Sequence, residues 1–265
     1  MIMRVHPVTL RSWCAVAAAT LLAVPAVASA EEPRGPGTPS DDSAPANLMA
    51  LTAPARLNAA PFSVTTWAGY DAAIKNPRIT ASVEAALVHR LSIAVGVNSS
   101  ADEQGQFALR PLIALRVQAL EQRATGIDAT AAVAYRQDRF DLDGGFFQST
   151  VAVGRRFDRL QVALNLTYGM DPEGDDYEGE ACAAASFEVR PSVYVGVDGR
   201  YRHDLGSSDP NRAGRDRTES ETLAGATAAY AHRNWAVMLE AGVSRIVTNS
   251  PRTAPVAMAG YTGTF

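Results

Sequence analysis

His203 is the side chain in this sequence whose neighbours could carry out acid–base chemistry. Asp204 follows it directly, and hydroxyls come shortly after it at Ser207-Ser208. A histidine beside a carboxylate, with a hydroxyl or a second acid such as Asp175 in reach, can act as a general base in hydrolysis. One histidine in an acidic, polar loop also arises by chance. We therefore expect a solvated loop residue and a chain that is not an enzyme.

A dense run of acids extends from Asp171 to Glu178, around Gly174. Carboxylate oxygens at this spacing could hold Ca²⁺ or bridge divalent ions to the phosphates of a lipid surface. The run lacks the full twelve-residue calcium loop with its closing glutamate, and this favours a solvated loop. We expect neither a metal nor a cofactor.

Other classes of chemistry are disfavoured by motif and charge. The sequence contains no nucleotide-binding loop, zinc motif or nucleophile elbow. Its 24 basic and 28 acidic residues give a net charge of −4, which disfavours nucleic acid as a partner because phosphate binding needs a basic face.

The elements that would position these side chains are β-strands. From Phe62 onward, apolar and polar residues alternate with period two between turn residues, which is typical of antiparallel strands. Most of the segments are longer than the five or six residues usual in soluble sheets, and they match the nine to eleven residues that a tilted strand needs to cross a membrane. Twelve strands are predicted: Phe62–Asp71, Ile79–Val88, Leu91–Ser99, Gln106–Ala119, Ile127–Gln137, Gly144–Arg156, Leu160–Met170, Tyr177–Arg190, Ser192–His203, Glu219–Ala231, Trp235–Val247 and Pro255–Phe265.

The connections between these segments largely alternate between minimal turns and longer polar loops. His89-Arg90 and Pro191 are turns, whereas Asp204–Thr218 is a long loop. Membrane barrels show this asymmetry, with short turns on the periplasmic side. Leu120–Gly126, which is long for a turn, and Ala72–Arg78, which is short for an outer loop, fit the pattern less well.

Two segments precede the strands. Residues 1–30 have a basic start, an apolar middle and a small-residue triplet before Glu31, which is the layout of a cleavable export signal. Its removal leaves 22 basic against 28 acidic residues, with Cys182 as the only cysteine. Residues 31–61 are rich in Pro, Ala, Gly and Ser, and we expect a disordered periplasmic arm.

The chain ends in an alternating strand whose last residue is Phe265, with Tyr261 four positions earlier. A barrel gains from such an end, because its last strand must seal against its first and leave no open edge in lipid. With the export signal and the strand–turn rhythm, Phe62 to Phe265 resembles bacterial outer-membrane β-barrel proteins as a class. Gly263 stands where a third aromatic often occurs in that class. The resemblance implies that the barrel-assembly machinery recognises Tyr261 and Phe265, and that outer-membrane lipid and lipopolysaccharide surround the barrel.

We therefore predict an all-β fold, a single antiparallel up-and-down transmembrane β-barrel of about twelve strands at 62–265. Alternation assigns one face of each strand to lipid, for example Leu160, Val162, Leu164 and Leu166. It directs charged residues inward, because a charge on the lipid face near the midplane costs about 2–4 kcal/mol. The residues expected to line the lumen are Glu84, Arg110, Arg116, Asp128, Arg136, Glu178, Glu180, Glu188, Asp198, Arg200, Arg202 and Glu240.

Two functions fit such a lumen, since twelve strands lie between barrels that side chains fill and open porins. One is a narrow pore for small solutes, whose charges tune selectivity. The other is a structural barrel braced by pairs of Arg and Glu, because an unpaired buried charge is expensive. The alternatives from other classes are a surface hydrolase that uses His203 with nearby aspartates, and a secreted soluble β-protein. In the soluble protein, stripes such as Leu164 and Leu166 would pack against a second sheet.

Overall fold

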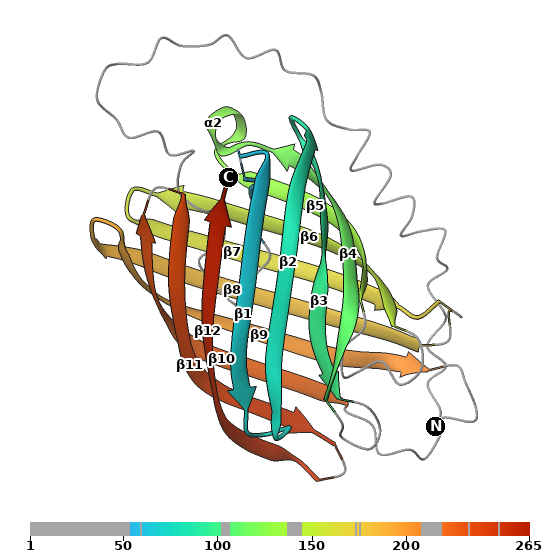
Figure 1. Cartoon of the computed structure of the whole chain (residues 1–265). Helices are drawn as coiled ribbons and strands as arrows, with labels where there is room; N and C mark the ends of the chain where they lie inside the picture. The colour runs from blue at the N-terminus through green and yellow to red at the C-terminus, as the bar shows by residue number, and fades with distance from the viewer. Residues whose placement is uncertain are drawn as a thin grey trace, which may run out of the picture. The chain divides into compact units, whose positions relative to one another are not determined.

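The computed structural model is a closed antiparallel β-barrel in which each strand pairs with its neighbours in sequence and β1 pairs with β12 (Figure 1). It describes residues 54–58, 60–101, 107–136, 145–172, 174, 176–207, 219–232, 234–248 and 250–265. The predicted export signal and most of the predicted arm lie outside these residues. The strands are β1 (Phe62–Asp71), β2 (Asn76–Val88), β3 (Leu91–Ala101), β4 (Phe107–Leu120), β5 (Asp128–Arg136), β6 (Phe146–Phe157), β7 (Leu160–Met170), β8 (Asp176–Arg190), β9 (Val193–Ser207), β10 (Ser220–His232), β11 (Trp235–Val247) and β12 (Arg252–Thr264).

The predicted fold is confirmed in strand number, direction and closure. The differences lie at strand ends. β2 begins at Asn76, β9 continues to Ser207 and β12 begins at Arg252, each a few residues beyond the prediction. These extensions lie at one end of the barrel. Strand pairing continues there without the strict apolar alternation that lipid contact imposes, so the extensions could not be predicted from the sequence pattern.

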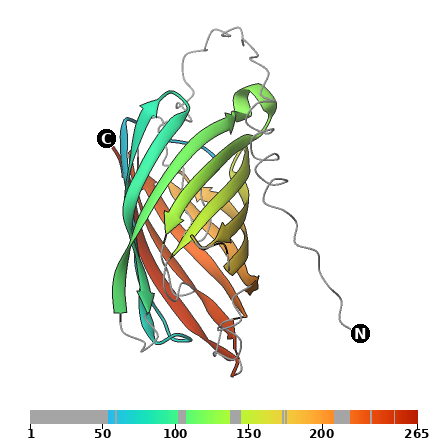
Figure 2. The same cartoon turned by 90° about the vertical axis from the view of Figure 1, so that its right-hand side faces the viewer.

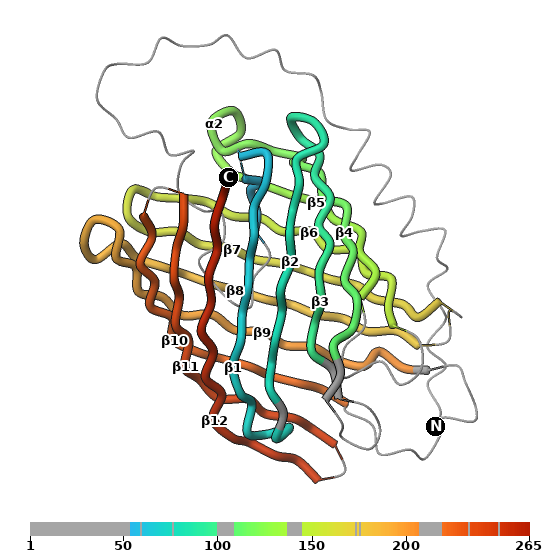
Figure 3. The backbone as a smooth tube through the Cα atoms, in the orientation of Figure 1, coloured from blue at the N-terminus to red at the C-terminus, as the bar shows by residue number. Residues whose placement is uncertain are grey.

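The barrel has two different rims. At the closure rim, which carries Phe62 and Phe265, the connections are short, such as 158–159 and 191–192. At the loop rim they are longer, such as 208–219. The long turn expected at the closure rim contains α2 (Gln122–Thr125), which ends at Gly126 in the left-handed conformation (φ 84°). The smooth trace in Figure 3 shows this small helix standing above the strand ends. Nowhere in the described part of the chain is a helix long and apolar enough to span a membrane.

The exterior of the barrel is an apolar band between two groups of aromatic residues. Large apolar side chains face outward at mid-height, such as Val133, Leu166 and Leu239. The strands cross this band at a steep tilt (Figure 2), as in membrane barrels, which carry aromatic girdles at both interfaces. The outward aromatics are Phe62, Phe157, Phe187, Tyr230, Trp235, Tyr261 and Phe265 near the closure rim, and Tyr70, Tyr135, Phe147, Tyr168, Tyr177 and Tyr201 near the loop rim.

The described outward positions between the two aromatic groups carry no ionisable side chain. Arg155 faces outward near the closure rim, where its guanidinium carbon lies 4.4 Å from the Phe157 ring centre. Leu164 and Leu166 remain exposed on the outside of a single ring. The expectation from the soluble alternative, that these stripes pack against a second sheet, is therefore wrong.

Candidate functional site

All residues predicted to line the lumen occupy inward-facing register positions. Asp128, Glu188 and Glu84 lie toward the closure rim, while Arg110 and Arg136 lie toward the loop rim. The alternation that makes β7 apolar outside places Asn165 and Thr167 inside, and the same parity carries the charged residues of the other strands inward.

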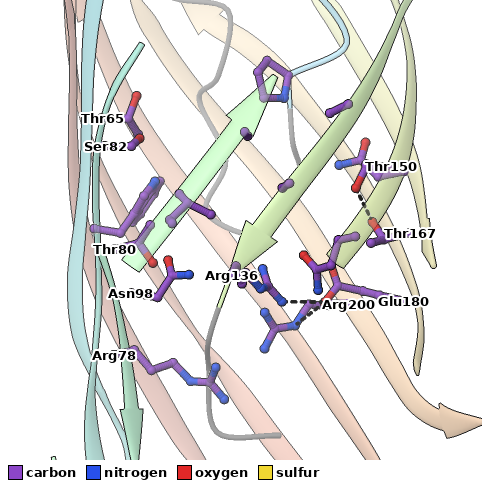
Figure 4. Close-up of a pocket in the computed structure, with 18 of the residues that line it drawn as sticks. Thr65, Arg78, Thr80, Ser82, Asn98, Arg136, Thr150, Thr167, Glu180 and Arg200 are labelled. Carbon is purple, nitrogen blue, oxygen red and sulfur yellow. Dashed lines mark hydrogen bonds and ion pairs between the residues drawn. The ribbon is translucent and has the colours of Figure 1, made fainter. Parts of the chain in front are cut away.

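Near the loop rim, six charged side chains form a chain of ion pairs across the lumen, which we call the charge belt: Arg136, Glu180, Arg200, Glu221, Arg78 and Asp71. Glu180 lies between Arg136 at 3.7 Å and Arg200 at 4.0 Å, as Figure 4 shows. Arg200 also pairs with Glu221 at 3.2 Å.

The belt then continues to the opposite wall. Glu221 on β10 pairs with Arg78 on β2, and these two strands are separated in the ring by β1, β12 and β11. The Arg78 guanidinium holds the Asp71 carboxylate with two nitrogens, at 2.8 and 2.6 Å. The belt alternates positive and negative groups from β5 to β1, and it therefore narrows the lumen and braces it.

Sequence reasoning missed three members of the belt. Asp71 is the last residue of its strand and Arg78 follows Asn76-Pro77, a dipeptide that looks like loop. The inward orientation of Glu221 could have been predicted, because the residue falls inside a predicted strand and a charge there must face inward.

A second buried ion pair lies behind the belt. Arg202 and Glu178 are 1% and 2% exposed, and the guanidinium donates to the carboxylate from two nitrogens. The Gln148 amide donates to the other oxygen of Glu178. A buried charge-assisted pair of this kind fixes the positions of β6, β8 and β9 relative to one another.

Charged residues near the closure rim form local pairs. Glu84 accepts hydrogen bonds from Ser92 and, at 2.9 Å, from Arg116. Glu188 lies 3.6 Å from Arg156. Asp128 accepts the backbone N–H of Gln122 at 2.8 Å, so its carboxylate anchors the α2 turn at the rim.

Asp198 and Glu240 are brought together on the β9–β11 wall. They are 5% and 3% exposed, and the Glu240 side chain lies over Gly225, the register partner of Asp198. A side chain at Gly225 would fill the space that lets these two carboxyl groups meet.

One sector of the lumen is filled by apolar side chains. Trp67, Leu223, Met238, Val256 and Met258 pack together from β1 and β10–β12, with alanines between them. Trp67 lies over Gly260, its register partner, where a Cβ would come within 2.6 Å of the indole ring. This cluster, together with the buried Asp198 and Glu240, therefore fills the lumen beside β9–β12 and β1.

The rest of the lumen is a polar cavity of about 290 Å³. Its walls combine hydroxyl, amide and charged side chains with apolar ones such as Ile79 and Leu112, and Figure 4 shows Thr65, Ser82, Thr150 and Thr167 above the belt. Thr65 and Thr262 are hydrogen-bonded at 3.1 Å, and Thr150 and Thr167 at 2.9 Å. The lining includes Arg78 and Glu221 at the loop rim and Pro54 and Asn58 at the closure rim.

The described residues place no catalytic partner beside His203, which the hydrolase alternative requires. Its imidazole faces outward and stacks on Tyr201 with ring centres 6.0 Å apart. The Asp204 carboxylate accepts the Gly206 N–H at 2.8 Å. Asp175 and Ser208 lie outside the described residues, as does the side chain of Ser207.

The acidic run from Asp171 to Glu178 is divided between two environments. Asp171 accepts the backbone N–H of Asp176 at 3.1 Å and closes the turn, while Glu178 lies in the lumen on Arg202. Among the described residues, no group of three or more His, Cys, Asp or Glu side chains could hold a metal ion.

No family model and no curated protein matches this sequence. Among solved structures, the NanC porin aligns with a TM-score of 0.55 at 9% identity, over 76% of this chain and 100% of its own. An outer membrane channel from Pseudomonas putida F1 aligns with a TM-score of 0.49 at 13% identity, over 86% of this chain and 100% of its own. The similarity to the NanC porin shows that the chain has the fold of a solved porin.

Proposed function

We propose that this chain is an integral protein of a bacterial outer membrane whose barrel forms a narrow pore for small polar solutes. The observation that carries the proposal is the polar cavity. It extends along the lumen from Pro54 and Asn58 to Arg78, inside a ring whose outside is apolar. A lumen lined by hydroxyls, amides and charges is suited to water and hydrophilic solutes.

The proposed location has consequences for the chain's partners. The export signal at 1–30 is cleaved, acyl chains solvate the apolar band, and lipopolysaccharide surrounds the loop rim. Tyr261 and Phe265 face outward beside the seam of the barrel, where the assembly machinery can bind them. No catalysis is proposed, because His203 points away from the lumen.

A structural barrel without transport is the second candidate, and the charge belt favours it. The pairs from Arg136 through Glu221 to Arg78 link opposite walls and leave little cross-section at that height. A pore requires small solutes to pass beside these side chains.

Planar-bilayer conductance of the refolded protein separates the two candidates. A pore gives discrete current steps, and removing one belt pair with Glu180→Ala and Arg200→Ala enlarges each step. Arg155→Ala, which removes an exterior guanidinium, and His203→Ala should leave the steps unchanged. If neither the native protein nor the belt variant conducts, while both show the heat-dependent gel shift of a folded barrel, the structural barrel is correct.

A further inference from the structure

The segment Pro54–Asn58 enters the barrel at the closure rim, although it belongs to the region predicted to be a disordered arm. The Leu57 N–H donates to Gln118 at 2.7 Å, and the Pro54 carbonyl accepts from Thr130 at 2.9 Å. The Asn58 amide donates to Ser63 at 3.0 Å. The segment is therefore held by side chains from β4, β5 and β1.

Gln118 contacts the backbone of this segment at two places. Its carbonyl oxygen accepts the Leu57 N–H, and its amide nitrogen donates to the Ala55 carbonyl at 3.2 Å. The same nitrogen lies 2.5 Å from the Leu120 carbonyl and 3.2 Å from the Ala129 carbonyl, so its two N–H groups are shared between the wall and the segment. Gln118 is only 5% exposed. Both hydrogen bonds go to backbone groups, so Gln118 recognises the backbone of the segment, whereas the Asn58 and Ala55 side chains contact Ser63 and Gly154.

The wall also provides the space that the segment needs. A Cβ on Gly154 would come within 2.8 Å of the Ala55 Cβ, so only glycine allows this approach. On its inner side the segment supplies Pro54 and Asn58 to the cavity lining. The segment therefore forms the floor of the cavity at the closure rim.

We propose that the mouth of the lumen at the closure rim is a binding site for a short peptide, and that Pro54–Asn58 occupies it as a tethered plug. The inference rests on the proposed pore. When the segment is bound, the cavity is closed toward the closure rim. When it leaves, the cavity opens there, and flux through the barrel rises. Gln118 and Thr130 position the plug.

Conductance of full-length variants tests the plug. Leu57→Pro removes the donated N–H, and Gln118→Ala removes its acceptor. Each should raise the ratio of open to plugged time by about two- to tenfold, the factor that corresponds to one net hydrogen bond. Gln122→Ala is the matched control. It loses two hydrogen bonds to Arg156 at the same rim, both of 2.8 Å, and does not touch the segment.

A peptide added in trans tests recognition directly. The probe is a synthetic peptide of residues 50–61, applied to a channel that carries Ala55→Gln and Leu57→Pro so that its own segment does not fit. The native peptide should restore the low open fraction, and a peptide with the same two substitutions should not. Blockage by both peptides would overturn the proposal, because binding would then be independent of Gln118.

A third measurement separates failure of the plug from failure of the pore. In a Cys182→Ala background, the thiol of Leu57→Cys should react with a bulky maleimide several-fold more slowly than in the same variant carrying Gln118→Ala. If the native protein conducts but Gln118→Ala changes neither conductance nor this rate, the plug is wrong and the pore stands. If no variant conducts, the pore and the plug are both overturned, and protection of the thiol shows only a structural segment.

Discussion

Phe62 and Phe265 exchange backbone hydrogen bonds and thereby close the ring. The Phe62 N–H donates to the Phe265 carbonyl at 3.2 Å, and the Phe265 N–H donates to the Phe62 carbonyl at 2.8 Å. The first and last residues of the barrel therefore form its final ladder step, and the Phe265 side chain remains 64% exposed on the outside. The backbone of Phe265 closes the barrel, and its ring is available to lipid or to a partner.

Two variants distinguish the contribution of the Phe265 backbone from that of its side chain. Deletion of Phe265 removes both closing hydrogen bonds and should lower the free energy of unfolding by about 1–3 kcal/mol. Phe265→Ala keeps both bonds and should cost less than the deletion in a urea titration of refolded protein. In cells, we expect Phe265→Ala to reduce the amount of folded protein in the outer-membrane fraction, because the aromatic ring is lost.

Val64→Ala serves as the control, because it removes an outward apolar side chain from the same seam without altering the terminus. If Phe265→Ala and Val64→Ala lowered the folded amount in cells equally, the terminal ring would have no special role in assembly.

The barrel could be predicted from the sequence because lipid imposes a periodic constraint. A charged residue in the apolar band is costly, so alternation along β7 or β9 reports the side that each residue faces. The presence of glycine at position 263, where a third aromatic often occurs, also has a structural reason. The Tyr261 ring bends over it, with the hydroxyl 2.6 Å from where a Cβ would lie, so one aromatic covers the place expected for another.

Contacts across the lumen could not be predicted, because they depend on where the ring closes. Arg78 and Glu221 are 143 positions apart and meet only because the barrel is narrow at that height. The docking of Leu57 on Gln118 is equally hidden, since one buried glutamine in a strand has no periodic signature. Alternation gives the face of a residue but not its partner on the opposite wall.

The charge belt should contribute strongly to stability at Glu221. Glu221→Gln removes the charge between Arg78 and Arg200, and Glu221 is 1% exposed. Breaking a buried ion pair by neutralising one partner typically costs 3–5 kcal/mol, and Arg78 retains Asp71, so we expect a loss of about 2–4 kcal/mol. Unfolding by urea in detergent, followed by tryptophan fluorescence, measures this loss.

Glu84→Gln is the comparison for that prediction. Its pair with Arg116 is similar in length at 2.9 Å, but these side chains are 12% and 21% exposed. Water screens the pair, and we expect a cost of about 1 kcal/mol. If the two variants lost equal free energies of unfolding, the charge belt would contribute no more to stability than an ordinary ion pair at the closure rim.

Two glycines of β12 should respond differently to alanine. At Gly260 the new methyl group meets the Trp67 ring, which is buried in the lumen, and overpacking costs about 1–3 kcal/mol. At Gly263 the methyl group meets the end of the Tyr261 side chain, which can rotate outward, so the cost should be a few tenths of a kcal/mol. Thermal unfolding of the two variants in a Trp235→Phe background, with the emission maximum of Trp67 as a local probe, tests the difference. A larger loss for Gly263→Ala would contradict the packing described for the lumen.

The apolar band gives the last prediction, because its environment decides whether the barrel lies in a membrane. Leu166 faces outward at mid-height on β7 and is 58% exposed. Leu166→Arg should cost about 2–4 kcal/mol in a lipid bilayer, because the guanidinium would have to be solvated by acyl chains. Leu160→Arg on the same face lies at the closure rim, where the cost falls to about 0–1 kcal/mol.

Reversible unfolding from lipid vesicles gives both values, and their difference is the informative quantity because helix or strand propensities cancel between them. A depth-dependent cost arises only if the outside of the barrel is in hydrocarbon. In water both substitutions would be nearly neutral and would raise solubility, since each replaces an exposed leucine with a charge. Equal, small effects at Leu166 and Leu160 would therefore show that the barrel does not lie in a membrane, and the proposed pore would be wrong.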